Sequence, residues 1–440
     1  MSQHTIFALS SGSLPSGVAI IRLSGPQCRF AVEATCGRVP VPRHASLLPI
    51  RDRNGVPLDE GLILFFPGPA SFTGEDTAEL QIHGGRATVK AVLSALGDLP
   101  GLRPAEAGEF SRRAFQNGKM DLVAVEGLAD LIAAETEMQR RLAAEHASGQ
   151  LSTLYDSWAK RLTHARAMIE AELDFADEDD VPGSIASTIW LDMQQLQQDI
   201  LNHLSGIRVG EIVRDGLNVV IAGPPNAGKS SLLNYLAKRD IAIVTDIPGT
   251  TRDVLHVDLD LAGYAVRLHD TAGLRETDDV VEREGIRRTH RSIDSAHLVL
   301  LLSSDAEVDW RSLAGSHTGP IIRVLTKTDT REASWPRGSA DVMISIKSGQ
   351  GMTELLDAVR AFLPDLESGG ALSLPTRERH FANLQEARRH IQHALDGELA
   401  GLDIQAEHLR LASQALGRVT GRVDVENLLD VIFSEFCVGK

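Results

Sequence analysis

The stretch from Gly223 to Ser230, G-P-P-N-A-G-K-S, constrains the fold most. It matches G-x-x-x-x-G-K-S, a pattern in which backbone N–H groups and a helix N-terminus converge on a phosphate. The apolar run Leu217 to Ala222 predicts a buried strand before it, and Ser231 to Lys238 predicts a helix after it. Lys229 supplies positive charge for phosphates, and the hydroxyl of Ser230 is a ligand for Mg²⁺. Strand, glycine loop and helix in this order predict a P-loop domain rather than a simple turn.

The length of 440 residues is too great for one hydrophobic core and predicts two or three domains. The net charge of −16 argues against a generally basic nucleic-acid wrapper but allows a local RNA-binding patch. Cys28, Cys36 and Cys437 form no C-x-x-C pair, which fits a reducing cytoplasm better than a disulfide scaffold. The chain opens without a signal-peptide pattern, and none of its apolar runs could span a bilayer. We therefore expect a cytoplasmic protein.

The chain changes character at three places, which predicts four segments. Residues 1–118 mix short strand-like runs with glycine turns and predict a compact α+β domain. Residues 119–212 place apolar residues three and four apart and predict long amphipathic helices. Residues 213–370 alternate strands and helices, which predicts a mostly parallel, doubly wound sheet with one antiparallel edge. Helical sequence returns in residues 371–440, so we infer one discontinuous helical domain into which the α/β domain is inserted.

Short apolar runs define the expected strands within these segments. In the first segment they lie at 18–23, 62–66 and 80–83, with a helix at 87–96. In the α/β segment they lie at 297–302, 321–325 and 342–346, after a hairpin formed by 255–261 and 264–269 and before a helix at 352–363. A last helix is expected at 425–433.

Two motifs after the P-loop carry further nucleotide chemistry. Asp270-Thr271-Ala272-Gly273 follows an apolar strand. Asp270 can hold the water shell of Mg²⁺, and Gly273 can offer its N–H to a γ-phosphate. Gly249-Thr250-Thr251-Arg252-Asp253 lies between the first helix and the second strand, where Thr251 can add a second hydroxyl to Mg²⁺.

The base of the nucleotide is predicted by two motifs at later strand ends. Thr326-Lys327-Thr328-Asp329 contains a carboxylate, Asp329, which can accept from N1–H and the 2-amino group of guanine. Adenine offers neither donor there, so guanine is favoured. Ser345-Ile346-Lys347 could close over the base. Each motif is weak alone, but four elements in the right order on strand ends predict a guanine-nucleotide switch.

Leu274 occupies the place where Ras-like GTPases have the glutamine that orients water. Glu282 and Glu284 are candidates to replace it. Asn226, with backbone carbonyls of residues 241–250, could hold a monovalent cation. The alternatives are a solvated surface charge for Glu282 and a loop-shaping role for Asn226, and spacing does not decide between them.

Three other features each have two interpretations. Cys437 lies near the end of the chain, where Lys440 could favour the thiolate, but composition alone favours an inert terminal thiol. His390 and His393 could form a metal pair, yet we prefer a solvated helix face because no third ligand is evident. The acidic run at 174–180 is interpreted as a helix exit rather than a cation site.

The whole chain resembles the tRNA modification GTPase family MnmE, also called TrmE. The resemblance covers all three parts of the chain, whereas a generic GTPase would share only the central part. The matching motifs are GPPNAGKSSLLN, VTDIPGTTRD, DTAGLRE followed by VEREGI, the terminal FCVGK, and the N-terminal VAIIRLSGP, SFTGEDTAELQIHGG and GEFSRRAFQNGKMDLVAVEGLADLI.

For the central domain, the resemblance implies a potassium-dependent GTPase that is activated when G domains dimerise. Glu282 matches the water-positioning base, and Ser230 and Thr251 match Mg²⁺ ligands. The positions that match K⁺ ligands are Asn226, Thr245, Ile247 and Thr250. The positions that match nucleotide contacts are Asn226, Ala227, Gly228, Lys229, Ser230, Ser231, Thr245, Thr250, Thr251, Asp270, Thr271, Ala272, Gly273, Thr326, Lys327, Asp329, Ser345 and Lys347.

For the rest of the chain, the resemblance implies an N-terminal folate-binding domain that also forms a homodimer. Arg22, Glu79, Lys119 and Lys440 match contacts to 5-formyl- or methylene-tetrahydrofolate, and Cys437 matches a cysteine needed for modification. The implied partner is the FAD-dependent protein MnmG (GidA), in a heterotetramer. Together they would add an aminomethyl or carboxymethylaminomethyl group to C5 of the wobble uridine in certain tRNAs.

Two positions depart from the family pattern. The base-reading motif is normally Asn-Lys-x-Asp, and Thr326 cannot present a side-chain amide to the purine or the P-loop, so we expect guanine selectivity with weaker affinity. Ile346 replaces the alanine of Ser-Ala-Lys. The alternative function is a ribosome-assembly switch without modification chemistry. The terminal motif and the N-terminal domain argue against it, because a pure switch needs neither.

Overall fold

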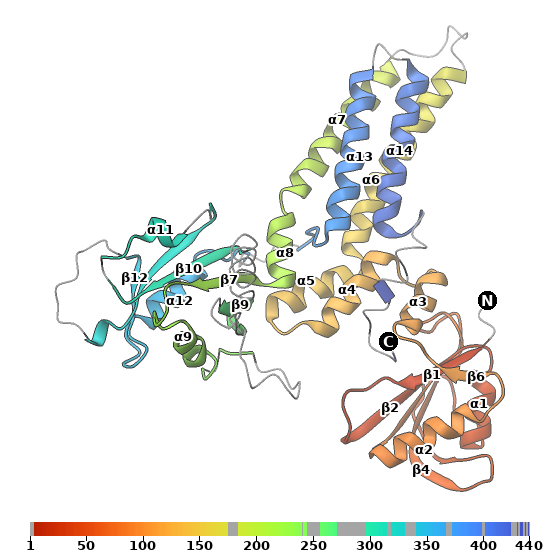
Figure 1. Ribbon diagram of the computed structural model, residues 1–440. Helices are drawn as coiled ribbons and strands as arrows, with labels where there is room; N and C mark the ends of the chain where they lie inside the picture. Colours follow the sequence, from red (N-terminus) through yellow and green to blue (C-terminus); the bar gives the residue numbers. More distant parts are fainter. Residues whose placement is uncertain are drawn as a thin grey trace, which may run out of the picture. The chain divides into compact units, whose positions relative to one another are not determined.

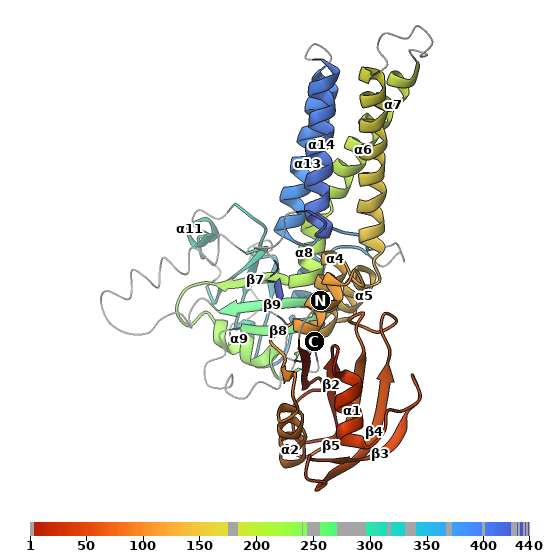
Figure 2. The same cartoon turned by 90° about the vertical axis from the view of Figure 1, so that its right-hand side faces the viewer.

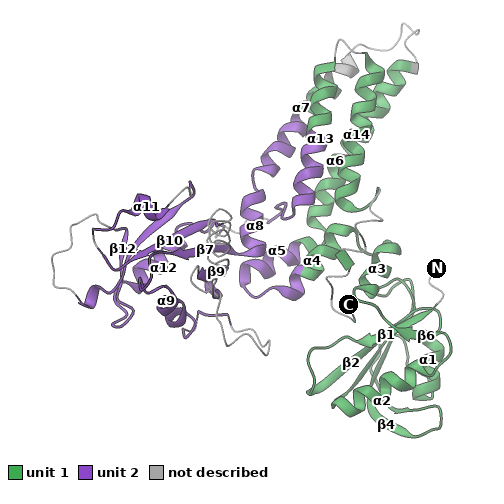
Figure 3. Cartoon of the chain, viewed as in Figure 1, with its two compact units in different colours: residues 1–129, 146–194, 389–440 green, residues 130–145, 195–388 purple. Residues whose placement is uncertain are grey.

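The structure is a computed structural model in which two compact units are discontinuous in sequence. Unit 1 comprises residues 1–129, 146–194 and 389–440, and unit 2 comprises residues 130–145 and 195–388 (Figure 3). The residues that it describes are 4–174, 184–239, 241–243, 256–270, 296–305, 307–314, 318–330, 340–366, 372–397 and 401–423, with 429, 432, 433, 436 and 439 of the tail.

Unit 1 begins with a six-stranded sheet in the order β3-β4-β5-β2-β1-β6. Its neighbours are antiparallel except β1 and β6, which are parallel. Helices α1 and α2 cover one face, where Ile21, Ile63 and Leu80 are fully buried (Figure 2). The elements are β1 Thr5–Leu9, β2 Ser16–Ser24, α1 Cys28–Cys36, β3 Ser46–Arg51, β4 Pro57–Phe66, β5 Thr77–Gly84, α2 Arg86–Gly97 and β6 Leu102–Pro104. The expected α+β domain is confirmed.

Helices from both sides of the α/β segment meet in unit 1. Helix α6 packs along α14, although the whole α/β segment separates them in sequence. Arg161 of α6 pairs with Asp192 of α7 at 2.7 Å, and Gln405 of α14 donates to the carbonyl of Ala394 in α13 at 2.7 Å. The helices of the two segments are α3 Glu109–Gln116, α4 Leu122–Ala133, α5 Glu137–Ala147, α6 Gln150–Asp174, α7 Ser184–Leu204, α8 Ile207–Asp215, α13 Glu378–Asp396 and α14 Leu402–Thr420. Of these, α8 and most of α5 belong to unit 2, and α4, α7 and α13 contribute residues to both units. The discontinuous helical domain is therefore confirmed.

Unit 2 contains the doubly wound sheet, in the order β12-β11-β10-β7-β9-β8 (Figure 1). The strands are parallel except for β8, which pairs antiparallel with β9 at the edge, as predicted. Helices α9 and α12 pack on one face and α11 on the other, since successive strand residues point to opposite faces. The elements are β7 Leu217–Ala222, α9 Lys229–Leu236, β8 His256–Leu261, β9 Tyr264–Asp270, β10 Leu298–Ser303, α11 Trp310–Ala314, β11 Ile321–Leu325, η2 Thr328–Thr330, β12 Val342–Met343 and α12 Met352–Arg360.

One expected strand is shorter than predicted. The apolar run at 342–346 predicts five strand residues, but β12 ends at Met343. The N–H of Ile344 still donates to Leu325, whereas the N–H of Ser345 donates to Gln350 in a turn. An apolar run in the sequence indicates burial, not strand pairing. Ile344 and Ser345 are fully buried, although both lie beyond the end of β12.

Two further expectations concern apolar and sulfur-bearing residues. In the described ranges, no helix has both the length and the apolar character that a bilayer crossing requires. Cys28 and Cys36 are free thiols inside unit 1, and burial raises the pKa of each. Both therefore remain protonated and unreactive at neutral pH.

Candidate nucleotide and N-terminal sites

The P-loop follows β7 and leads directly into α9, so the helix begins two residues earlier than predicted. Gly223 has a φ of 149°, and a Cβ there would lie 2.1 Å from the carbonyl oxygen of Leu302 in β10. Gly228 has a φ of 95° and caps the N-terminus of α9. Only glycine permits this close approach and this backbone turn. The loop thus brings its own N–H groups and those of α9 to one edge of the sheet.

Two side chains of the P-loop already have oxygen partners. The Nζ of Lys229 donates to the carbonyls of Gly223 at 2.9 Å and Pro224 at 3.0 Å. The hydroxyl of Ser230 donates to the carboxylate of Asp270, at the end of β9, over 2.7 Å. A hydroxyl and a carboxylate this close are hard oxygen donors of the kind that Mg²⁺ prefers. The residues present therefore fit a magnesium site.

At the other end of the site, Ser345 orients the carboxylate that was expected to read the base. The hydroxyl of Ser345 donates to Oδ1 of Asp329 at 2.7 Å. This hydrogen bond, aided by the charge of Lys347, lowers the pKa of Asp329. Asp329 is exposed in the short helix η2, whereas Ser345 is fully buried. A fixed, ionised carboxylate is what acceptance from two guanine N–H groups requires.

Residues of the base-reading motif also hold the P-loop. The hydroxyl of Thr326 donates to the carbonyl of Ala227 at 2.7 Å, and the Nζ of Lys327 donates to the carbonyl of Asn226 at 2.7 Å. From sequence, Thr326 was expected to lack the amide that would contact the P-loop. Its hydroxyl makes such a contact instead, because the side chain is buried directly against the loop. The weaker affinity inferred from the missing amide therefore loses one of its grounds.

The structure brings many of the expected nucleotide residues to one edge of the parallel sheet, beyond the carboxyl ends of its strands, where such folds bind ligands. The residues gathered there are Asn226, Ala227, Gly228, Lys229, Ser230, Ser231, Asp270, Thr326, Lys327, Asp329, Ser345 and Lys347. The remaining predicted site residues, Thr245, Ile247, Thr250, Thr251, Thr271, Ala272, Gly273, Glu282, Cys437 and Lys440, lie outside the described residues, as do Leu274, Glu284 and most of the acidic run.

In unit 1, Arg22 and Glu79 form a cross-strand ion pair between β2 and β5. Nε and Nη2 of Arg22 donate to Oε1 of Glu79 at 3.1 and 2.9 Å. The rings of Phe72 and Phe110 lie 5.4 and 5.9 Å from the guanidinium. The pair remains about one-fifth exposed, with side-chain values of 22% and 20%. A partly exposed charge pair beside two aromatic rings can bind a planar, charged ligand.

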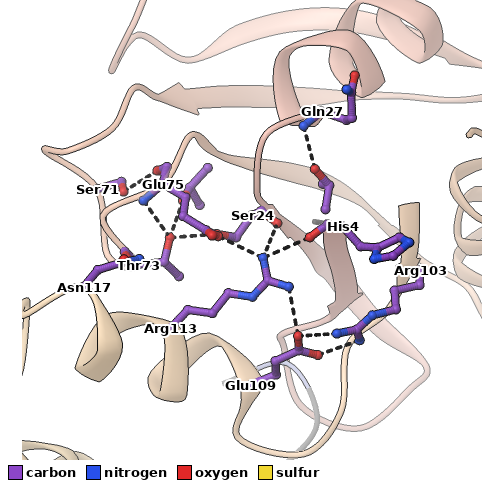
Figure 4. A network of polar contacts seen from close by, with 12 residues as sticks. His4, Ser24, Gln27, Ser71, Thr73, Glu75, Arg103, Glu109, Arg113 and Asn117 are labelled. Atoms are coloured by element: carbon purple, nitrogen blue, oxygen red, sulfur yellow. Dashed lines mark hydrogen bonds and ion pairs between the residues drawn. The ribbon is translucent and has the colours of Figure 1, made fainter. Parts of the chain in front are cut away.

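A buried ion network holds the loop that carries Phe72 (Figure 4). Arg113 of α3 is only 3% exposed and bonds Glu75 at 3.0 Å and Glu109 at 2.9 Å. Glu109 also pairs with Arg103 at 2.6 Å, and these hydrogen bonds outweigh its burial and lower its pKa. From sequence, these residues had no assigned role. Their opposite charges in SFTGED and GEFSRR were the available signal.

Lys119 follows α3 and contacts the loop that carries Phe72. Its Nζ donates to the carbonyl of Pro69 at 3.1 Å, and its side chain is exposed. Phe72 of this loop contacts Arg22, so the loop connects two of the four positions expected to contact folate.

The described residues of the tail dock onto unit 1. Phe433 and Phe436 are buried with Val125 of α4, at 0% and 7% exposure. Gly439 accepts a hydrogen bond from the hydroxyl of Ser10 at 2.8 Å, and its φ of 101° allows close contact with the carbonyl of Leu9. Leu9 ends β1, in which Ala8 is the register partner of Arg22. Ser10 was missed because only tertiary structure shows that the tail returns to β1.

The histidine pair has the third neighbour that the sequence analysis did not find. His408 of α14 lies with its ring centroid 5.4 Å from that of His390 and 5.2 Å from that of His393, and the Nδ1 atoms of His390 and His408 are 3.2 Å apart. His393 is exposed and His390 and His408 are partly exposed, so the helix face is solvated as expected, with a third histidine in contact. Even so, no group of three or more His, Cys, Asp or Glu side chains in the described ranges is arranged to hold a metal ion.

Comparison with known proteins covers the whole chain. The family model for the MnmE helical domain matches residues 122–437, and that for the GTP-binding protein TrmE N-terminus matches residues 5–119. A solved structure, the G domain of the T. maritima FeoB iron transporter, is 24% identical over 34% of this chain and 99% of its own length, with a TM-score of 0.25.

Three relatives from bacteria are each called tRNA modification GTPase MnmE. The protein of Rhizobium meliloti (strain 1021) is 60% identical over 100% of both chains. That of Sinorhizobium medicae (strain WSM419) is 61% identical over 99% of both, and that of Brucella canis is 53% identical over 99% of this chain and 98% of its own. The match extends through the N-terminal sheet, the helices and the P-loop unit alike, so the chain belongs to the MnmE family of tRNA modification GTPases.

Proposed function

We propose that the protein hydrolyses GTP and, with MnmG, modifies C5 of the wobble uridine of certain tRNAs. The observation that supports this most is that the tail returns to β1 beside Arg22, while a complete P-loop lies in the other unit. A pure nucleotide switch needs the P-loop but gains nothing from a docked C-terminus. Nucleotide turnover would therefore drive conformational change, and the modification would occur elsewhere in the cytoplasmic complex.

In the nucleotide site, Asp329 accepts from N1–H and the 2-amino group of guanine, and Ser345 holds it in place. Lys229 would exchange its hydrogen bonds to the carbonyls of Gly223 and Pro224 for contacts with the phosphates, whose negative charge attracts its ammonium group. Ser230 and Thr251 would hold Mg²⁺, with Asp270 behind its water shell. The bound metal neutralises charge on the phosphate oxygens. The hydroxyl of Ser230 can bind Mg²⁺ through a lone pair while its proton still donates to Asp270, so this hydrogen bond is compatible with the proposed site.

Water positioning falls to Glu282 in this proposal, because Leu274 has no polar atom. We place K⁺ at Asn226, Thr245, Ile247 and Thr250, where oxygen ligands can complete the charge around the phosphates when two G domains pair. Asn226 is already held in a defined conformation, because Lys327 donates to its carbonyl and its φ is 64°, in the left-handed region. Such a fixed loop suits an ion ligand.

The potassium assignment is tested by GTP turnover in KCl and in NaCl at equal ionic strength. Faster hydrolysis in KCl is expected, since a site built for K⁺ holds the smaller ion less well. Asn226→Ala should remove the difference between the two salts. Equal wild-type rates would exclude the cation from the mechanism.

In unit 1, Arg22, Glu79, Lys119 and Lys440 would bind a 5-formyl- or methylene-tetrahydrofolate that supplies the one-carbon unit. The guanidinium of Arg22 near two aromatic rings suits a planar ring system, and Lys119 suits a carboxylate. We assign the homodimer contact to this domain and FAD to the partner MnmG. Cys437 would act in the modification chemistry.

Mass analysis of wobble nucleosides separates the two activities. Cys437→Ser should retain GTP turnover but lose modification of the wobble uridine in a complemented deletion strain. Cys28→Ser is the matched control, because its buried thiol has a raised pKa and no assigned role. Retained modification in Cys437→Ser would remove this thiol from the mechanism. No folate binding, with normal tRNA in the deletion strain, would favour the ribosome-assembly switch.

A further inference from the structure

Thr326 occupies the position at which the family pattern has asparagine, and its polar atoms are fully engaged inside the protein. The side chain is 0% exposed. Its N–H donates to the carbonyl of Ser303 at 2.7 Å. Its hydroxyl lies 2.7 Å from the carbonyl oxygen of Ala227 and 3.2 Å from that of Ser303. Thr326 therefore joins β10, β11 and the P-loop at one buried point.

Proton counting limits what this residue can offer to a base. A hydroxyl has one proton, and both neighbouring oxygens are carbonyls, which only accept. The proton of Thr326 is thus committed to Ala227, with Ser303 as the longer partner. Guanine presents N7 and O6 as acceptors on this kind of edge. The side chain at 326 has no second donor for either atom, whereas an asparagine amide has two N–H groups.

The opposite edge of guanine is covered by another residue. Asp329 is ionised and oriented by Ser345, so it accepts from N1–H and the 2-amino group. Lys327 is occupied at the carbonyl of Asn226. Recognition by the side chains of Thr326, Lys327 and Asp329 is therefore one-sided.

We propose that Thr326 is a positioning residue that ties the base-reading strand to the P-loop, and that this chain selects guanine without a side-chain contact to N7. The inference rests on the proposed binding of guanine nucleotides. Its consequence is that nucleotides of 7-deazaguanine, which have a C–H in place of N7, bind as well as those of guanine.

Competition against a fluorescent GDP analogue measures this on the full-length wild-type protein. GDP and 7-deaza-GDP should have dissociation constants within about twofold of each other, since no hydrogen bond distinguishes them. Inosine diphosphate lacks the 2-amino group that Asp329 binds and should be weaker by about tenfold or more. Inosine diphosphate is therefore the positive control, which shows that the assay detects the loss of one contact to the base.

Three substitutions at the same position separate positioning from base reading. Thr326→Val keeps the shape and removes the hydroxyl, so GDP and 7-deaza-GDP should weaken together by about five- to tenfold. Thr326→Ser keeps the hydroxyl and should retain the wild-type affinities. Thr326→Asn adds a spare N–H and should favour GDP over 7-deaza-GDP by about three- to tenfold.

The outcomes are distinct. A wild-type protein that binds 7-deaza-GDP tenfold more weakly than GDP would overturn the one-sided recognition. A folded Thr326→Val with unchanged GDP affinity would overturn the positioning role, and its melting temperature shows whether it is folded. If Val unfolds the unit, a folded Thr326→Ser that binds GDP more weakly than the wild type would overturn the role of the hydroxyl instead. A protein that binds no GDP at all would instead refute the proposed function.

Discussion

At the scale of single residues, the nucleotide site depends on which side chains are already committed to the protein. Thr326 gives its proton to the P-loop, while Asp329 is held by Ser345 and faces solvent. The first and last residues of this four-residue motif thus have different roles. The buried hydroxyls hold the P-loop and Asp329 in place, and we propose that the exposed carboxylate selects guanine.

Asp329→Asn should therefore exchange the base that is recognised. The amide places N–H donors opposite N1–H and the 2-amino group, so GDP affinity should fall by about 100-fold, as two charge-assisted hydrogen bonds are lost. Xanthosine diphosphate has a carbonyl at C2 and should gain affinity in the same variant. Titration of both nucleotides measures the exchange.

Asp341→Asn is the matched control for this substitution. Asp341 pairs with Arg323 at 2.6 Å at the edge of the same sheet, and its described hydrogen bonds are all to Arg323. Its variant should bind GDP as the wild type does. Weak GDP binding by both variants would point to damage to the sheet rather than to base selection.

At the scale of elements, glycines set how closely a loop approaches its neighbouring strand. Gly349 and Gly351 lie before α12 with φ values of 77° and 75°. A Cβ at Gly351 would lie 1.9 Å from the backbone oxygen of Met343, whereas one at Gly349 would meet only the hydroxyl of Tyr235 at 3.0 Å. An alanine at either position would have the same strained backbone conformation, but only an alanine at Gly351 would collide with the backbone of a neighbouring strand.

The pair isolates the energetic cost of close approach. Gly349→Ala should lower the free energy of unfolding by about 1–2 kcal/mol, the cost of a left-handed backbone for alanine. Gly351→Ala should cost about 1–3 kcal/mol more, because β12 must move. Urea denaturation of unit 2 measures both. Equal losses would show that the backbone at Met343 yields without cost.

A second element-scale effect is the pH dependence of the β7–β10 contact. Nδ1 of His297 accepts from the N–H of Asn218 in β7 at 3.0 Å, so this nitrogen must be unprotonated. Burial, and then the charge of Arg208, lowers the pKa of His297. The unfolded chain takes up the proton first, so stability is full above a pH of about 6.5 and is lost as the pH falls below it.

His297→Asn should flatten this dependence, since its side-chain oxygen can accept the same hydrogen bond without titrating. Denaturation at pH 7.5 and 5.5 compares the wild type and the variant. His269 in β9 also has a pKa lowered by burial, so part of the pH effect should persist in the variant. An undiminished loss of stability would exclude His297 as a source.

At the scale of the whole molecule, each unit is completed by distant parts of the sequence. Unit 1 needs the C-terminal tail, because Phe433 is fully buried beside Phe115 and its backbone lies against Gly108. Unit 2 holds residues 130–145 and the P-loop domain. Stability and nucleotide binding should therefore respond to different substitutions.

Phe433→Ala should lower the free energy of unfolding of unit 1 by about 3–5 kcal/mol, because it leaves a cavity in a closed cluster. GDP affinity should remain that of the wild type, since the P-loop lies in unit 2. Phe362→Ala removes a phenylalanine that is 39% exposed and should change neither value substantially. Calorimetry and GDP titration check both. A parallel loss of GDP affinity in Phe433→Ala would contradict the separation.

The sequence by itself determined the local chemistry and the fold class. The P-loop, the parallel strands and the antiparallel edge follow from periodicity and from glycine spacing, which depend on neighbours in sequence. The carboxylate proposed to bind the base was identified from its place after β11. These features are local, so their signal does not require knowledge of distant contacts.

Only the tertiary structure decided which distant groups meet. It brought Gly439 to Ser10, His408 to the pair on α13, and Arg113 to the acids around it. It also showed that the short side chain of Thr326 reaches the P-loop. The physical reason is that burial and hydrogen-bond partners depend on packing between elements, whereas sequence patterns report only the periodicity within one element.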